Sequence, residues 1–472
     1  MPHSALRALL SLAGVPESAV ETCRIVGRAP VLPTRFRIGA AGAAAIAAAA
    51  MAANELWAER THEPRQAIAV DLHHAVAALR SARYLRIDGK PPKEPFDRLS
   101  GFYEAEGGRS VFLHCNFPHH RAAALGVLGL RGEVERTAVA AAVRDRDALQ
   151  LEDAIHAGGG CAAFVRTPAE WAAHPQQSAI ASLPLLEIER IGAAPPEPLP
   201  PAGDRPLAGV RVLDLTRVLA GPTCARTLAE HGAEVLKISA PHLPHSGEIE
   251  IDTGLGKRAA FLDLRDAGDI ATLAALIRDG RCDVFSQSYR PGTLAARGFG
   301  ADALAALRPG IVAVELSAWG RAGPWAARRG FDTIVQCSSG MAMIDGGDKP
   351  RLLPVSAIDY VSGYLMAMGA MVALLRRARE GGSWRVRVSL ARTGQWIVER
   401  GLVDAAALDG LPKELPEDEI KRITMETGSL LGVIRHLRPV AQMSETPPRW
   451  SHPPSPLGAD PPAWPARGDQ LG

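Results

Sequence analysis

One acid, Asp359, stands at the head of the long apolar stretch 356–382, which reads SAIDYVSGYLMAMGAMVALLRRAREGG. A carboxylate at the start of a helix can accept hydrogen bonds from free N–H groups, which contributes about 1 kcal/mol. The same N–H groups can also keep a partly buried carboxylate ionised, so that it can attack an acyl carbon as a nucleophile. The two roles are physically compatible, and the pattern alone leaves both open.

The residues after Asp359 show helical periodicity. Apolar side chains recur at spacings of four, three, four and three residues, which predicts one buried helix face: Val361, Leu365, Met368, Val372 and Leu375. Cations suit the negative pole at the end of a helix, and glycines stop it: Arg376, Arg377 and Arg379, then Gly381 and Gly382. The pattern therefore predicts that Asp359 lies at or near the N-cap.

Strands and helices alternate through the region that precedes this helix. Short apolar strands are predicted at residues 210–215, 233–238, 259–264, 282–288 and 310–320, with helices such as 223–232 and 269–280 between them. Such alternation is typical of βαβ units, so the expected fold class is α/β, with a doubly wound parallel sheet in a Rossmann-like large domain. Ligands of these sheets bind outside the carboxyl ends of the strands, which points to the loop 216–222.

That loop lacks the fingerprints of the common nucleotide sites. Its single Gly221 stands where GxGxxG needs three glycines, and the next strand ends at Ser239 rather than at an acid that would hold a ribose. The sequence also contains no GxxxxGKS/T loop. These observations argue against NAD binding and against P-loop chemistry.

Composition excludes several other classes. A net charge of +2 over 472 residues is too balanced to indicate a nucleic-acid or membrane partner. The six cysteines form no CxxC pair and the N-terminus lacks the order of a signal peptide, so we expect a cytoplasmic protein. The alanine-rich stretch from Ile38 predicts a close-packed soluble helix, because alanine repays little of the cost of spanning a bilayer.

Five segments follow one another in the order and near the spacing of the family III CoA-transferases: 206–238, 256–265, 289–300, 317–340 and 357–382. The first reads PLAGVRVLDLTRVLAGPTCARTLAEHGAEVLKI and the fourth reads SAWGRAGPWAARRGFDTIVQCSSG. Residues 206–401 thus resemble the CaiB/BaiF group, which includes formyl-CoA and carnitine-CoA transferases and, as relatives, methylacyl-CoA racemases.

This resemblance implies a reaction and its partners. Asp359 corresponds to the family's nucleophile, which would attack a donor acyl-CoA to give a mixed anhydride, then an aspartyl-CoA thioester that an acceptor carboxylate resolves. The implied substrates are an acyl-CoA and a carboxylic acid, with no metal and no cofactor other than the CoA thioester itself. Members of the family form intertwined dimers, so a homodimer of interlocked chains is expected.

The resemblance also implies a CoA site, in which arginines would hold the phosphates and an apolar slot the adenine. The corresponding residues are Arg217, Val218, Leu219 and Ala220 in the first loop, Leu262 and Arg265 near the adenosine end, Ser288 and Tyr289 at the next strand end, and Arg297. Arg297 departs from the pattern, because the family's arginine falls one place earlier, at Ala296. A shift of one residue can move a side chain off the ligand.

Two alternatives to CoA transfer stay open. One is an acyl-CoA racemase or isomerase, although such relatives carry a histidine at the place of Phe331 and a phenyl ring cannot move protons. The acid Asp332 beside it leaves this alternative some support. The other is a non-catalytic acyl-CoA-binding protein, which the departures in the CoA site and the order of the chain's parts would fit.

The N-terminal part resembles a second copy of the helix and strand that follow Asp359. A shift of 318 positions aligns three strand residues with three others, Ile68, Val70 and Leu72 with Val386, Val388 and Leu390. At that shift Asp359 corresponds to Ala41, so the copy lacks the nucleophile and we expect it to be structural.

Residues 97–118 and 170–192 resemble the opening and the end of the family's smaller domain, which here precedes the large one. Proline-dense runs start at Ile191 and Ser444 and read as a linker and an extended tail. The expected parts are a partial copy at 1–90, a smaller α+β domain at 91–190, a linker at 191–207, the large CoA-binding domain at 208–410 and a proline-rich tail at 411–472.

Two motifs of the smaller domain invite functional interpretation. The segment EGGRS at 106–110 is a candidate for the glycine-rich loop that closes over the aspartate in this family. Four residues cluster in LHCNFPHH: His114, Cys115, His119 and His120. Their spacing matches no common zinc site, which favours packing or lining of an acyl pocket over metal ligation.

Overall fold

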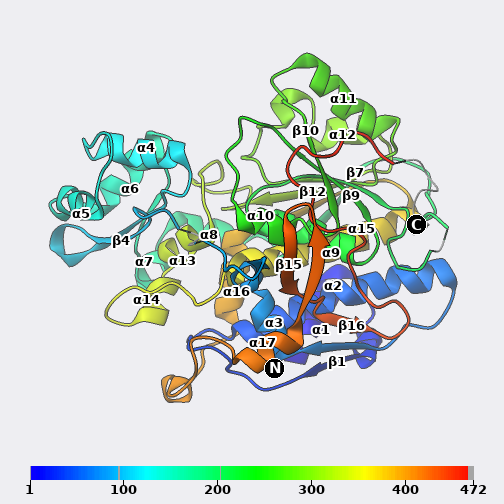
Figure 1. Cartoon of the computed structure of the whole chain (residues 1–472), viewed down its shortest axis with the longest axis horizontal. Coiled ribbons are helices and arrows are strands. Elements are labelled where there is room, and N and C mark those ends of the chain that lie inside the picture. Colours follow the sequence, from blue (N-terminus) through cyan, green and yellow to red (C-terminus); the bar gives the residue numbers. More distant parts are fainter. Residues whose placement is uncertain (1, 94–95, 202, 466–472) are drawn as a thin grey trace.

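A seven-stranded sheet forms the centre of the molecule in a computed structural model that describes residues 2–93, 96–201 and 203–465 (Figure 1). The strand order is β10-β9-β8-β11-β12-β13-β7, in which six strands are parallel and β7 pairs antiparallel with β13. The strands are β7 (Glu187–Gly192), β8 (Arg211–Leu215), β9 (Glu234–Ser239), β10 (Lys257–Phe261), β11 (Val284–Gln287), β12 (Val312–Ser317) and β13 (Ser383–Ser389). The order reverses between β8 and β11, where doubly wound sheets bind their ligands.

Both faces of this sheet are covered, which confirms the predicted doubly wound α/β fold. Neighbouring residues of one strand enter different cores: Val212 packs in the core that includes α9 and α15, and Leu213 packs in the core that includes α11 and α12. The covering helices are α9 (Ala220–Glu230), α11 (Ala267–Arg278), α12 (Ala301–Leu307) and α15 (Ala357–Glu380). Helices α11 and α12 lie above the sheet in Figure 1.

The N-terminal part, predicted to be a partial copy, contains a helix as long as the one that carries Asp359. Helix α2 (Ile38–Thr61) has 24 residues, as α15 has, and the two helices pack against each other. After α2 come β2 (Ile68–Asp71) and α3 (Leu72–Ala78), as β13 and α16 (Leu390–Glu399) follow α15. The repeated strand does not join the main sheet, because β2 pairs with β1 (Cys23–Val26) and β16 (Ala441–Met443).

Helices α2 and α15 are also the two described helices that are long and apolar enough to cross a membrane. The apolar window of each is 100% buried inside the protein. Their hydrophobic surface is therefore accounted for by packing within the core, and the short alanine side chains of α2 allow close approach to α15.

The smaller domain has a core of its own and projects to one side of the molecule (Figure 1). Its antiparallel sheet consists of β4 (Gly101–Glu104), β5 (Ser110–Leu113) and β6 (Ala162–Phe164), and its helices are α4 (Pro118–Val127), α5 (Arg136–Arg144) and α6 (Ala148–Ala157). Two short helices, α7 (Pro168–Ala172) and α8 (Pro175–Ala181), lead back to the large sheet. The predicted domain boundaries stay predictions, although β7 already pairs within the large sheet.

The C-terminal part differs from the extended tail predicted for residues 411–472. It begins with α17 (Glu417–Ile423) and the hairpin of β14 (Thr424–Ser429) and β15 (Gly432–Leu437), which pairs with β3 (Arg86–Ile87). After β16, the described residues up to 465 form no helix or strand, and they run over the large domain, where the indole N–H of Trp450 donates to the carbonyl of Arg226 at 3.2 Å. The density of prolines in this later part obscured the hairpin before it.

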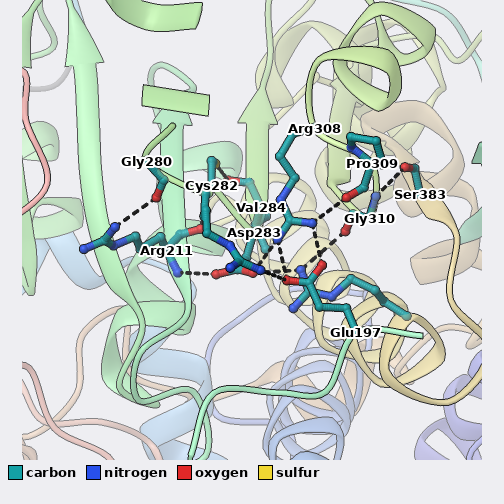
Figure 2. Close-up of polar contacts among 12 residues, drawn as sticks. Glu197, Arg211, Gly280, Cys282, Asp283, Val284, Arg308, Pro309, Gly310 and Ser383 are labelled. Carbon is teal, nitrogen blue, oxygen red and sulfur yellow. Dashed lines mark hydrogen bonds and ion pairs between the residues drawn. The ribbon is translucent and has the colours of Figure 1, made fainter. Parts of the chain in front are cut away.

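A buried ionic network holds the end of α15 (Figure 2). The guanidinium of Arg377, with 0% of the residue exposed, donates to Asp283 at 2.7 Å. Asp283 also accepts from the backbone N–H of Arg211 at 2.9 Å, and Arg308 donates to Glu197 of the linker at 2.7 Å. Arg308 also donates to Asp283 at 3.4 Å, so the network ties α15 to β8, to the residue before β11 and to the linker. It thereby fixes the helix that carries Asp359 near its other end.

Candidate active site

A cavity of about 310 Å³ opens at the carboxyl ends of β8, β11 and β12. The loop after β8, the loop after β11 and the start of α15 each contribute to its wall. Seven of the predicted site residues line it: Arg217, Val218, Leu219, Ala220, Ser288, Tyr289 and Asp359. The structure thus brings the predicted nucleophile and most of the predicted CoA contacts to one place.

The other predicted residues lie around a neighbouring cavity of about 110 Å³. Its lining includes Leu262, Arg265 and Arg297, and it shares Tyr289 and Thr293 with the first cavity. Arg265 pairs with Asp263 at 2.6 Å. Arg297 reaches the cavity despite its displaced position in the sequence, and its guanidinium donates to backbone carbonyls, including that of Leu264 at 3.1 Å.

Asp359 is the third residue of α15 rather than its N-cap, which is Ser356. The carboxylate that caps the helix belongs to Asp332, which accepts a hydrogen bond from the backbone N–H of Asp359 at 3.0 Å. Gln336 holds Asp332 in place, since its amide donates to the same carboxylate and accepts from the N–H of Leu353 at 2.8 Å. The expected cap interaction therefore exists, but another acid makes it.

This exchange of roles changes the electrostatics of Asp359. Burial raises the pKa of Asp359 well above its usual range, and the charge of Asp332 raises it further. The role left open above, in which helix N–H groups keep Asp359 ionised, finds no support here, because the N–H of Asp359 is donated to Asp332 and Asp332 adds a like charge. Burial raises the pKa of Asp332 as well. Once ionised, a carboxylate of raised pKa is a stronger base and a stronger nucleophile.

Three arginines of the cavity wall were not predicted: Arg290, Arg328 and Arg329. Arg328 is engaged with Asp153 of the smaller domain at 3.2 Å. Among the described residues, Arg290 and Arg329 have no carboxylate partner, and burial together with the charge of Arg290 lowers the pKa of Arg329. Both stand within family-like segments next to residues that were singled out, YRPG and ARRGFD, and this adjacency could have indicated them.

The smaller domain closes the cavity with aromatic side chains. Phe117, His119 and His120 line it, and the ring of His114 stacks on Phe331 with centroids 4.1 Å apart and planes 3° apart. Burial lowers the pKa of His120 to about 3, so this imidazole stays neutral. Within residues 2–93, 96–201 and 203–465, no group of three or more metal-ligating side chains is close enough to hold an ion.

The candidate glycine-rich loop lies elsewhere. Residues 106–110 form the turn between β4 and β5, with Gly107 and Gly108 at positive φ. Arg109 of this turn pairs with Glu170 at 2.9 Å. The described residues that line the cavity include none from this turn, so the expectation that it closes over Asp359 finds no support.

Comparison with known proteins places these features in a family. Residues 207–426 match the sequence pattern of CoA-transferase family III. The chain is 30% identical over 421 residues to the acetyl-coenzyme A transferase nodX of Hypoxylon pulicicidum, an alignment that covers 78% of this chain and 70% of that protein. It is 33% identical over 207 residues to the acetyl-CoA:oxalate CoA-transferase of Acetobacter aceti, covering 41% of this chain and 52% of the enzyme.

A CaiB/BaiF family protein from Brucella suis aligns in structure with a TM-score of 0.38 and 24% identity, over 42% of this chain and 56% of that one. The chain therefore spans only about half the length of several relatives that it matches. Its alignment with the fungal relative is long enough, however, to decide membership. On the family pattern over 207–426 and this extended relationship, the chain belongs to CoA-transferase family III.

Proposed function

We propose that this protein transfers CoA from an acyl-CoA thioester to a carboxylic acid, with Asp359 as the nucleophile. The observation that carries the proposal is the position of Asp359, which lines a cavity together with the residues that correspond to CoA contacts in the family. Burial raises the pKa of Asp359, so that its carboxylate, once ionised, is more basic than that of an exposed aspartate, which suits attack on a thioester.

The proposed reaction has four steps. The ionised carboxylate of Asp359 attacks the donor thioester, so that a mixed anhydride forms and CoA leaves as a thiolate. The thiolate attacks the aspartyl carbonyl, which releases the donor acid and leaves an aspartyl-CoA thioester. The acceptor carboxylate attacks this thioester and again expels the thiolate. The thiolate then attacks the acceptor's acyl carbon, which yields the new acyl-CoA and regenerates Asp359.

The two cavities together offer a path for CoA. The smaller one, with Leu262, Arg265 and Arg297, would take the adenosine end, and the larger one would take the thioester beside Asp359. Arg290 and Arg329 line the larger cavity from two different loops. Their positive charges would bind the phosphates of CoA. The start of α9 at Ala220 lines the larger cavity, and its N–H groups would stabilise the oxyanion that forms in each step.

The relatives suggest which substrates to test first. One is named an acetyl-coenzyme A transferase and another an acetyl-CoA:oxalate CoA-transferase. We therefore propose acetyl-CoA as the first donor and small carboxylic acids, oxalate among them, as acceptors. The proposed chemistry requires neither a metal nor a cofactor beyond the CoA thioester.

Transfer is favoured over racemisation by the wall of the cavity. Phe331 lines it where racemase relatives carry histidine, and its phenyl ring offers no group that can exchange a proton. Its ring is also held between aromatic partners of the smaller domain, including His114. Deuterium exchange at the α-carbon of a 2-methylacyl-CoA measures this alternative directly, and we expect none above the rate without protein.

The test of the proposal is a covalent adduct. The wild-type protein is incubated with acetyl-CoA and other acyl-CoAs, and intact-protein mass spectrometry should then find CoA bound through a thioester to Asp359. Asp359→Asn should abolish the adduct and lower the transfer rate by roughly a thousandfold or more, because the amide is not a nucleophile. Asp348→Asn is the matched control, since this aspartate is exposed and does not line the cavity, and it should leave the adduct unchanged.

Binding of CoA without any adduct in the wild type would contradict catalysis and favour the non-catalytic acyl-CoA-binding protein. An adduct on a residue other than Asp359 would contradict the assignment of the nucleophile.

We also propose a cytoplasmic homodimer, as the family resemblance implies. The six cysteines are free and buried, which fits a reducing compartment. Light scattering of the purified protein should give twice the mass of one chain, and fractionation of cells should recover it without detergent.

A further inference from the structure

The loop that carries the CoA contacts has a backbone conformation that its sequence does not favour. Val218, in the middle of the loop 216–222, has φ of 69°. A β-branched residue in the left-handed region is a genuine outlier, because its side chain crowds the backbone there. Such a conformation persists only when the surroundings impose it. Something beneath the loop must therefore hold it.

A buried aspartate lies beneath the first end of this loop. Asp214, 0% exposed and one residue before the end of β8, accepts a hydrogen bond from the backbone N–H of Thr216 at 3.0 Å. The hydroxyl of Thr216 donates to the same carboxylate oxygen. Two donors of one residue thus orient the start of the loop toward Asp214.

Two buried lysines contact the two ends of the loop 216–222. Lys257 of β10, 1% exposed, donates to Asp214 at 2.8 Å and to the carbonyl of Pro222 at 2.8 Å. Lys237 of β9 donates to the carbonyl of Thr216 at 3.3 Å. The three side chains come from three adjacent strands, and their partners outside the cluster are the two ends of the loop.

The two lysines favour the charged form of Asp214. Burial alone would raise the pKa of Asp214, but the charges of Lys257 and Lys237 outweigh it and hold that pKa below its usual range. Burial lowers the pKa of Lys257 to about 8 against the opposing charge of Asp214. A buried ion pair contributes little stability compared with apolar packing, so its presence calls for a role in geometry.

We infer that Asp214, Lys257 and Lys237 form a positioning cluster that holds the loop 216–222 in the conformation that binds CoA. This inference rests on the proposed function, because it concerns the loop assigned to CoA there. The cluster touches no ligand itself. It acts through the loop, and Asp359 lies on α15, so loss of the cluster should weaken CoA binding much more than it slows chemistry after binding.

The experiment measures the Kd of CoA by titration calorimetry on the full chain. Lys257→Met removes the two hydrogen bonds that the ammonium group donates, to Asp214 and to Pro222, while it keeps most of the length of the side chain. It should weaken CoA binding by roughly tenfold, as loss of preorganisation does. Lys349→Met, at an exposed lysine, is the matched control and should leave the Kd unchanged. In transfer assays, Lys257→Met should raise KM for the donor by a similar factor while kcat changes less than about twofold.

A double-mutant cycle separates positioning from a purely structural role. Glycine adopts positive φ without strain, so in a Val218→Gly background the loop needs less support. We expect Lys257→Met to weaken binding less than about threefold there, which is a coupling that independent sites do not show. Thr216→Val, which removes only the hydroxyl contact with Asp214, gives a milder variant that should show the same direction if Lys257→Met does not fold.

The outcomes are distinct. Equal losses of affinity from Lys257→Met with and without Val218→Gly, or a loss of kcat at unchanged KM, would overturn the positioning role while leaving the proposed function intact. Wild-type protein that binds no CoA would contradict both. Weakened binding that Val218→Gly relieves supports the inference.

Discussion

At the scale of single residues, the site depends on a pair of acids that lie 27 positions apart in the chain. Asp332 caps α15 through the N–H of Asp359, and its charge adds to burial in raising the pKa of Asp359. The proposed nucleophile, Asp359, therefore does not cap the helix, and its carboxylate is more basic than that of an exposed aspartate. Its activity must depend on pH, because only the carboxylate form attacks.

We predict a shift of that pH dependence in Asp332→Asn. The rate constant kcat/KM should rise with pH through the raised pKa of Asp359 and then level off. Asparagine can still accept the hydrogen bond from Asp359 but carries no negative charge, so the pKa of Asp359 falls and the acid limb moves to lower pH. Profiles of kcat/KM against pH for both proteins measure the change. An acid limb that stays in place or moves to higher pH would contradict the electrostatic coupling.

At the scale of elements, α15 is held at both of its ends. Asp332 caps its start, and Arg377 near its end donates to Asp283. Figure 2 shows the ionic network around Asp283. Between these points its surface is buried against α2, α9 and the sheet. A helix fixed at both ends places Asp359 against the cavity with little freedom to move, which favours a preorganised nucleophile.

Removal of one member of the network tests this anchoring. Arg377→Met leaves the buried carboxylate of Asp283 without its shortest guanidinium contact and should lower the free energy of unfolding by about 3–5 kcal/mol, as loss of one partner of a buried pair does. Arg379→Met is the matched control, because Arg379 pairs with Glu59 at the surface and should contribute about 0.5 kcal/mol or less. Urea denaturation measures both. Equal effects of the two substitutions would contradict a special role for the buried network.

At the scale of the whole molecule, segments that are far apart in the sequence pack against the large domain. The smaller domain precedes the large one in the chain, yet its Phe117 and His120 line the cavity at which Asp359 lies. The last described residues lie against the large domain, where the indole N–H of Trp464 donates to the carbonyl of Leu276 at 3.0 Å. The fold therefore closes through contacts between its two halves and its C-terminal part.

The contribution of the C-terminal part can be measured at Trp450. Its indole packs against the core and donates to the carbonyl of Arg226, so Trp450→Ala should lower the free energy of unfolding by about 3 kcal/mol. Leu430→Ala, at the tip of the hairpin where the leucine is 87% exposed, should change it by less than about 0.5 kcal/mol. Thermal unfolding of the two variants compares them. A melting temperature of Trp450→Ala equal to that of the wild type would show that the extended segment does not stabilise the fold.

Much of the site could be predicted because its residues follow the ends of regular strands. Periodicity places the strands, and the ends of parallel strands meet at one edge, so Arg217 after β8 and Ser288 after β11 had to lie close together. Arg290 and Arg329 were missed, since arginines on loops are common and only their convergence on one cavity distinguishes them. The hairpin of β14 and β15 was missed because its sequence stands next to prolines that dominate the composition.

The sequence by itself determined the doubly wound sheet, the loops that bear the site and the helix that begins beside Asp359, because these depend on local periodicity and on the order of elements along the chain. Only the tertiary structure decided which acid caps that helix, which aromatic side chains close the cavity and which lysines support its first loop. Those pairings join residues tens to hundreds of positions apart, and burial brings them together and sets their charge states. No local sequence pattern predicts such long-range contacts, so they are seen only in the folded chain.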